Sequence, residues 1–213
     1  MRRLINDGSL IVSLNPNSPR TETYRLLRTR IQFSSKDHEL NTLMVTSSQA
    51  GEGKTTTISN LAVIYAQEGK KVLLIDANMR KPSLHRIFSQ LNHQGLSTLL
   101  TRQTSNGDAI QETSISHLHL LPSGPVPSNP SELIDSKAMW ELLETLEKQY
   151  DVILIDTPSI LDVSDSVILS AMCDGVIMVA AAGKAKKDHL RKAKDQLSHV
   201  NARILGVVLN QVG

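Results

Sequence analysis

The chain has 213 residues and is 40% hydrophobic, which is enough for one sizeable domain with a buried core. Its 23 Lys and Arg residues nearly balance 21 Asp and Glu residues, and the net charge of +2 gives no electrostatic reason to expect binding to nucleic acid or to an anionic membrane surface. The single cysteine, Cys173, excludes an internal disulfide, and with no secretory signal and no apolar run of 18 residues we expect a cytoplasmic protein.

The N-terminal region divides into two parts. Residues 1–20 mix polar residues with two prolines and show no sustained period, so we expect a mobile arm there. Residues 21–34 place apolar side chains near helical spacing, which predicts a helix. We expect this helix to begin a single domain over residues 21–213.

The most informative stretch is residues 47–56, SSQAGEGKTT, which lies between a strand-like run and a helix-like run. It fits the pattern G-x-x-x-x-G-K-[ST], except that Ser48 replaces the first glycine. In this pattern the glycine-rich backbone turns N–H groups toward phosphate, the lysine reaches the β- and γ-phosphates, and the Ser or Thr hydroxyl binds magnesium. We therefore predict a nucleotide site formed by Ala50, Gly51, Glu52, Gly53, Lys54, Thr55 and Thr56. The alternative is a simple glycine turn beside a solvated lysine, which does not explain why three threonines follow that lysine.

After residue 41, short apolar runs alternate with helical patterns, which predicts a doubly wound α/β fold with a mostly parallel sheet. Several runs, such as VLLID and VILID, are continuously apolar up to a final aspartate, as in strands that are buried on both faces. Residues 90–130 show no clear period, and the prolines of SGPVPSNPSEL predict an extended loop before Ser131 caps a helix. The predicted strands are 42–47, 71–76, 118–121, 152–156, 175–181 and 203–209, and the predicted helices are 54–67, 82–89, 130–149, 164–172 and 185–199.

Two of the predicted strands end in an acid, Asp76 and Asp156. Because ligands of open α/β sheets sit at the carboxyl ends of the strands, we expect both carboxylates to lie beside the loop at 47–56. Asp156, within IDTP, fits the Walker B role of holding Mg²⁺. The alternative for each aspartate is a turn former or a helix N-cap.

Phosphoryl transfer also needs cations to take up charge and a group that accepts the acceptor's proton. Polar and cationic side chains follow Asp76 within the stretch DANMRKP. The catalytic candidates are therefore Lys54, Asp76, Asn78, Arg80 and Asp156, and the expected metal ligands are Thr55, Asp76 and Asp156.

This ordered set of motifs resembles the bacterial tyrosine kinases of the capsular and exopolysaccharide type, the cytoplasmic kinase half of a polysaccharide co-polymerase. A P-loop alone occurs in many folds, whereas this set runs across nearly the whole chain and is specific. The motifs are E-x-x-R-x-x-R at Glu22, Arg25 and Arg28, GEGKT at 51–55, LLIDANMRKP at 73–82, SGPVPSNPSEL at 123–133 and ILIDTPS at 153–159.

The resemblance implies a P-loop NTPase fold with deviant Walker motifs, ATP and Mg²⁺ as ligands, and protein tyrosine as the acceptor, in the control of exopolysaccharide or capsule synthesis. It implies that Asn210 lies near the adenine. It also implies that the helix over 21–34, with Glu22, Arg25 and Arg28, joins subunits into a ring. A separate transmembrane modulator is the implied partner, whose cytoplasmic tail activates the kinase and recruits it to the inner face of the membrane.

The chain departs from the family pattern at two places. The second acidic motif usually reads D-x-D-x-R, but here Asn78 stands in place of the second carboxylate. An amide cannot accept a proton as a carboxylate does, so either Asp76 suffices as the base or activity is reduced. The tyrosine-rich tail of the family is also not in this sequence, so either it was cut away or this member phosphorylates other proteins.

Two other functions fit parts of the pattern. A ParA/MinD-type ATPase shares the fold and the deviant P-loop, but the lysine that this group usually carries five residues before the P-loop lysine is Gln49 here. A regulator that binds nucleotide without catalysis, and so controls assembly of a polysaccharide machine, is the reading that Asn78 would favour.

Overall fold

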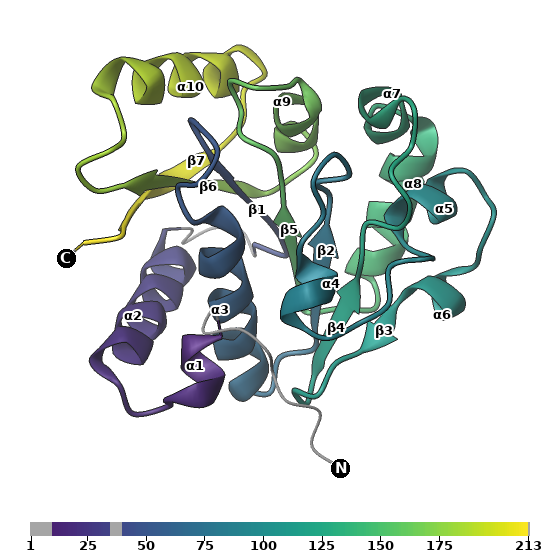
Figure 1. Cartoon of the computed structure of the whole chain (residues 1–213), viewed down its shortest axis with the longest axis horizontal. Coiled ribbons are helices and arrows are strands. Elements are labelled where there is room, and N and C mark those ends of the chain that lie inside the picture. Colours follow the sequence, from purple (N-terminus) through teal and green to yellow (C-terminus); the bar gives the residue numbers. More distant parts are fainter. Residues whose placement is uncertain (1–9, 35–39, 213) are drawn as a thin grey trace.

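The computed structural model describes residues 10–34 and 40–212 of the chain. Its sheet has the strand order β3-β4-β2-β5-β1-β6-β7, and every neighbouring pair is parallel except β3 and β4 (Figure 1). The predicted doubly wound α/β fold is therefore confirmed. The strands are β1 (Thr42–Ser47), β2 (Val72–Asp76), β3 (Gln111–Glu112), β4 (Leu118–Leu121), β5 (Val152–Asp156), β6 (Gly175–Ala181) and β7 (Ile204–Asn210).

Helices cover both faces of this sheet (Figure 1). None of the helices in the described ranges has both the length and the apolar character that crossing a membrane requires. The helices are α1 (Ile11–Leu14), α2 (Pro19–Phe33), α3 (Lys54–Gln67), α4 (Leu84–Ile87), α5 (Leu96–Leu100), α6 (Asn106–Ala109), α7 (Pro130–Ile134), α8 (Lys137–Glu147), α9 (Asp165–Ser170) and α10 (Lys187–His199).

The central strands are buried on both faces because their side chains alternate between two cores. In β1, Leu43 and Val45 pack with α1 to α4, whereas Met44 packs with the helices of the opposite face. In β5, Leu154 and Ile155 divide in the same way. This arrangement on two buried faces explains the continuous apolar runs of the sequence.

The N-terminal segment differs from the predicted mobile arm. Residues 1–9 lie outside the described part, but Leu10 and Val12 are 1% and 0% exposed, and α1 lies against α3. The Val12 N–H donates to Asn60 Oδ1 of α3 at 3.0 Å. Residues 10–20 are therefore part of the domain. A four-residue helix is too short to show a period, which is why the sequence did not reveal it.

The predicted helix over 130–149 is two helices, α7 and α8. Ser136 has an extended backbone and accepts a hydrogen bond from Met139 N at 3.3 Å, so it caps α8 instead of continuing α7. The expected cap at Ser131 is wrong, because α7 begins one residue earlier, at Pro130, whose missing N–H suits the first position of a helix.

The other predicted elements are present with small changes at their ends. The six predicted strands agree with the structure within one residue at each end. The predicted helices over 82–89, 164–172 and 185–199 are shorter than expected, as α4, α9 and α10. The short elements α5, α6 and β3 lie within the segment that showed no clear period.

Candidate functional site

Two acids meet at the carboxyl edge of the sheet. Strands β2 and β5 pair in register, which places Asp76 opposite Asp156, and β1 with its phosphate-binding loop is the other neighbour of β5. Both aspartates are completely buried. The predicted convergence of the two acids is therefore confirmed, and it follows from the parallel strand order.

The loop after β1 has the backbone of a phosphate cradle. Gly51 and Gly53 have φ values of +81° and +92°, a left-handed conformation that favours glycine. Gly53 is the N-cap of α3, and no side chain in the described ranges caps that helix end. The free N–H groups of the first turn and the positive end of the helix dipole suit phosphate oxygens.

Ser48 closes this loop in place of the usual glycine. Its hydroxyl donates to Glu52 Oε2 at 3.0 Å, and the same oxygen accepts from the backbone N–H of Gln49 at 2.9 Å. Both Ser48 and Glu52 are buried. The departure from the glycine pattern is therefore compensated by an internal side-chain contact, which holds the first half of the loop.

Lys54 is buried within the cradle, with 8% of its surface exposed. Its ammonium group donates to Ser47 Oγ at 3.0 Å and to Ser159 Oγ at 3.3 Å. Burial lowers the pKa of Lys54, and the nearby charge of Asp156 opposes that shift. The alternative of a solvated surface lysine is therefore wrong. Neutral hydroxyls are weaker partners than phosphate oxygens, so this ammonium group can exchange them for a bound phosphate.

Thr55 and Asp156 form the best candidate for a magnesium site. The Thr55 hydroxyl donates to Asp156 Oδ2 at 2.6 Å, whereas Asp156 Oδ1 is buried without a hydrogen-bond partner in the part of the chain that the structure describes. An unpaired buried carboxylate oxygen indicates a place for a cation or an ordered water. Among the described residues, no three His, Cys, Asp or Glu side chains cluster as metal ligands. Such a sparse site fits Mg²⁺, which typically binds one or two carboxylates together with substrate phosphates and water.

Asp76 accepts three backbone hydrogen bonds, from Asn78 N at 3.2 Å, Ser83 N at 2.9 Å and Leu84 N at 3.0 Å. It thus also holds the start of α4, in line with the alternative interpretation as a helix-capping acid. Burial raises the pKa of Asp76 to about 6, and burial together with the Asp76 charge raises the pKa of Asp156 to about 7. The pair therefore retains a proton far more readily than ordinary aspartates do.

Asn78 and Arg80 lie in the loop that follows Asp76, and both make local contacts. Asn78 Oδ1 accepts from Lys81 N at 3.3 Å, which is a turn-stabilising role. The Arg80 guanidinium binds the carboxylate of Asp165 and the hydroxyl of Ser131, so it is held by α9 and α7. The sequence did not lead us to predict a role for Asp165, although an acid soon after the IDTPS motif could have indicated a residue at the same edge of the sheet.

The end of β7 is attached to the cradle. Asn210 Nδ2 donates to Glu52 O at 3.1 Å, and Gln211 Nε2 donates to Gly51 O at 3.2 Å. A Cβ on Gly53 would lie 1.8 Å from Asn210 Nδ2, so this side chain would have to move, and the φ of +92° at Gly53 independently favours glycine. The contact of Gln211 was not predicted. The position of Asn210 beside the adenine stays a prediction.

Three charged residues of α2, Glu22, Arg25 and Arg28, form contacts within the domain. Arg25 Nη1 pairs with Glu22 Oε2 at 3.1 Å, three residues away on the same helix. Arg28 forms an ion pair with Glu68 at the end of α3 and donates to Gln32. All three residues lie on α2, away from the carboxyl edge. Their role in contacts between subunits stays a prediction.

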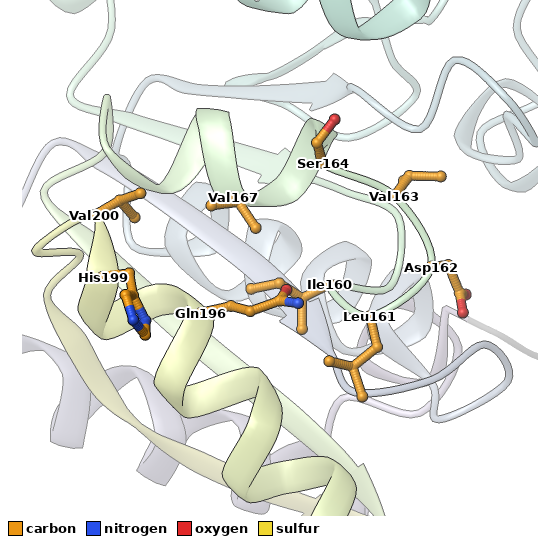
Figure 2. A pocket seen from close by; sticks show the side chains of 9 residues that line it. All are labelled: Ile160, Leu161, Asp162, Val163, Ser164, Val167, Gln196, His199 and Val200. Carbon is orange, nitrogen blue, oxygen red and sulfur yellow. The ribbon is translucent and has the colours of Figure 1, made fainter.

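A separate hollow of about 450 Å³ lies between the loop after β5, α9 and α10 (Figure 2). Side chains that line it include Ile160, Leu161, Gln196 and His199. None of the predicted nucleotide-binding residues lines it. This hollow is therefore separate from the predicted nucleotide site.

Comparison with known proteins identifies close relatives. The family described as an AAA domain matches residues 40–202. The tyrosine-protein kinase YwqD of Bacillus subtilis (strain 168) is 44% identical over 202 residues, which cover 95% of this chain and 85% of that protein.

Solved structures of related proteins also superpose on this chain. The kinase domain of the Escherichia coli tyrosine kinase ETK superposes with a TM-score of 0.94 at 33% identity, covering 100% of this chain and 83% of that one. The cell division ATPase MinD of Pyrococcus furiosus has a TM-score of 0.71 at 26% identity, covering 81% of this chain and 73% of that one. The chain is therefore more similar to the kinase domain than to this ATPase.

Proposed function

This chain belongs to the family of bacterial tyrosine-protein kinases, and we propose that it transfers the γ-phosphoryl group of ATP to tyrosine hydroxyls of proteins. The observation that carries the proposal is the register of Asp76 and Asp156 beside a phosphate cradle with a buried lysine. We further propose, from the family resemblance, that the substrates act in capsule or exopolysaccharide synthesis.

Each group at this edge has a role that its chemistry supports. Lys54 and the first turn of α3 bind the phosphates, and Thr55 and Asp156 hold Mg²⁺. When bound, Mg²⁺ supplies positive charge against the phosphate oxygens. Asp76 accepts the proton of the tyrosine hydroxyl, and its raised pKa makes it a stronger base than an ordinary aspartate.

The experiment that tests this proposal is incubation with labelled ATP, Mg²⁺ and a tyrosine-bearing peptide, with the matching phenylalanine peptide as the control. Label on the tyrosine peptide alone supports the kinase. Release of phosphate without transfer indicates a MinD-type ATPase. Nucleotide binding without turnover indicates a regulator, the function that an amide at Asn78 in place of the family's carboxylate would favour.

Replacing Asn78 with aspartate is expected to raise the rate of tyrosine phosphorylation by about ten- to a hundredfold. This is less than the full effect of a positioned general base, because Asp76 already acts as a base. The amide and the carboxylate are nearly isosteric, so the affinity for ATP should change little. Steady-state kinetics with the tyrosine peptide measures both quantities. The control is Asn106→Asp, which adds the same charge on α6. A rate at or below that of the starting protein would show that Asp76 and Asp156 suffice.

We also propose that the protein forms a ring through Glu22, Arg25 and Arg28, and that a transmembrane modulator recruits it to the inner face of the membrane and activates it. The support is the match of these three residues to the family motif. Arg25 is 43% exposed and Glu22 is 69% exposed at their side chains, so both are accessible to a second subunit.

Replacement of Glu22, Arg25 and Arg28 by alanine is expected to leave a folded monomer, because it removes the charges that would pair across the interface. Light scattering measures the oligomer and circular dichroism checks the fold. The control is the triple alanine variant of Asp188, Arg191 and Lys194, which repeats the charges and spacing on exposed positions of α10. An unchanged oligomer, or a starting protein that is monomeric even with the modulator tail added, would refute the interface.

A further inference from the structure

Arg80 is fixed by two residues from distant parts of the chain. Its Nε donates to Asp165 Oδ2 at 3.0 Å, and its Nη2 donates to Asp165 Oδ1 at 3.1 Å and to Ser131 Oγ at 2.9 Å. The Ser131 hydroxyl in turn donates to Asp165 Oδ1 at 2.6 Å. The carboxylate of Asp165 is therefore fully engaged by one guanidinium and one hydroxyl.

The two sides of this guanidinium have different surroundings. The side chain of Asp165 is 0% exposed, whereas that of Arg80 is 38% exposed. An arginine has five N–H donors, and the contacts with Asp165 and Ser131 use those of Nε and Nη2. No described residue accepts a hydrogen bond from Nη1. Arg80 is thus immobilised along one edge while two donors remain open along the other.

The cluster bridges the carboxyl edge at which the two acids meet. Arg80 follows β2, Asp165 begins the helix that follows β5, and β2 and β5 are neighbours in the sheet. Ser131 belongs to α7, which lies beside α9 near the top of Figure 1. In parallel sheets ligands bind at this edge, so the loop that carries Arg80 lies on the ligand side of the fold.

We propose that Asp165 and Ser131 are positioning residues that hold Arg80 so that its Nη1 binds the phosphate oxygens of the transferred group, both in transit and as product phosphotyrosine. This inference rests on the proposed kinase function. An arginine suits this task because it is planar and stays charged, and its charge strengthens the hydrogen bonds that Nη1 donates to phosphate. Fixing it beforehand removes the need to order a flexible side chain during the reaction. The competing explanation is a plain structural contact that joins α7, α9 and the loop after β2.

The experiment compares Arg80→Gln, Asp165→Asn and Ser131→Ala, with Glu141→Gln as the control. The control removes one charge from the exposed Lys137–Glu141 pair of α8. For each variant, kcat and KM for a tyrosine peptide, KM for ATP, inhibition by phosphotyrosine and the melting temperature are measured.

We expect Arg80→Gln and Asp165→Asn to lower kcat by about ten- to a hundredfold and Ser131→Ala by about three- to tenfold, with KM for ATP within about twofold of the starting value. Inhibition by phosphotyrosine should weaken in parallel. Asp165→Asn should add little to Arg80→Gln in the double variant, because both act through the same guanidinium.

A melting temperature that falls in Asp165→Asn while kcat and phosphotyrosine inhibition stay unchanged would overturn the proposal, and so would additive effects in the double variant. If Asp165→Asn does not fold, the Ser131→Ala variant provides the test, because it keeps the ion pair between Arg80 and Asp165. If the starting protein phosphorylates nothing, the proposed kinase function is refuted separately from this inference. Calorimetric titration with phosphotyrosine then decides the inference, since equal binding to the starting protein and to Arg80→Gln would refute it.

Discussion

Replacing Lys54 with methionine is expected to lower phosphoryl transfer by about three orders of magnitude while leaving the fold intact. Lys54 is the cation within the cradle, and its ammonium group donates hydrogen bonds to the neutral hydroxyls of Ser47 and Ser159. Methionine preserves the apolar stem, and losing a buried charge whose pKa burial already lowers should not reduce stability.

The measurements are single-turnover transfer to a tyrosine peptide, ATP affinity by calorimetry and the melting temperature. The control is Lys137→Met on α8, where the lysine side chain is 89% exposed. Unchanged ATP affinity and turnover in folded Lys54→Met protein would remove the cradle from the mechanism.

Replacing Asp156 with asparagine is expected to have opposite effects on activity and on stability. Transfer should fall by about 10²- to 10³-fold, and the Mg²⁺ concentration for half-maximal activity should rise, because the amide is a poorer ligand for a hard cation. Magnesium titrations of the kinase rate measure both effects. Replacement of Asp76 should instead affect transfer more than binding, and the reverse pattern for the two acids would exchange their roles.

The stability of the Mg²⁺-free protein should fall as pH rises from about 4 to about 7. An unfolded aspartate has a pKa near 4, whereas burial raises the pKa of Asp76 to about 6 and that of Asp156 to about 7. In this window the folded state binds more protons than the unfolded chain, so each rise in pH favours unfolding. The penalty is complete only above the folded pKa values of the two acids.

Asp156→Asn removes its share of this penalty, and at pH 8 in a chelator its melting temperature should exceed that of the starting protein by several degrees. At pH 4 the two should be nearly equal. Calorimetric melting across this range is the measurement, with Asp188→Asn on exposed α10 as the control. A lower melting temperature for Asp156→Asn at pH 8 would show that the carboxylate is paired more favourably than its burial indicates.

The local pattern of the sequence was sufficient for the six parallel strands and for the position of the two acids, but not for the short edge strand β3. Continuous apolar runs ending in Asp76 and Asp156 predicted two buried strands, and the structure places these acids opposite each other. This worked because a strand buried on both faces needs an unbroken apolar run, and because parallel strands bring their carboxyl ends to one edge. The phosphate loop was equally visible, since its glycines and lysine are adjacent in the chain.

Contacts between residues far apart in the chain were decided only by the tertiary structure. Arg80 and Asp165 are 85 positions apart, and no period or motif linked them before the strands were paired. The burial of Leu10 and Val12 against the domain, and the contact of Lys54 with Ser159, likewise depend on neighbours from other segments. The raised pKa values of the two acids have the same origin, because desolvation and a neighbouring charge exist only after packing removes the water. A sequence specifies which groups lie at the end of a strand, but packing determines which of them share a proton, a partner or a ligand.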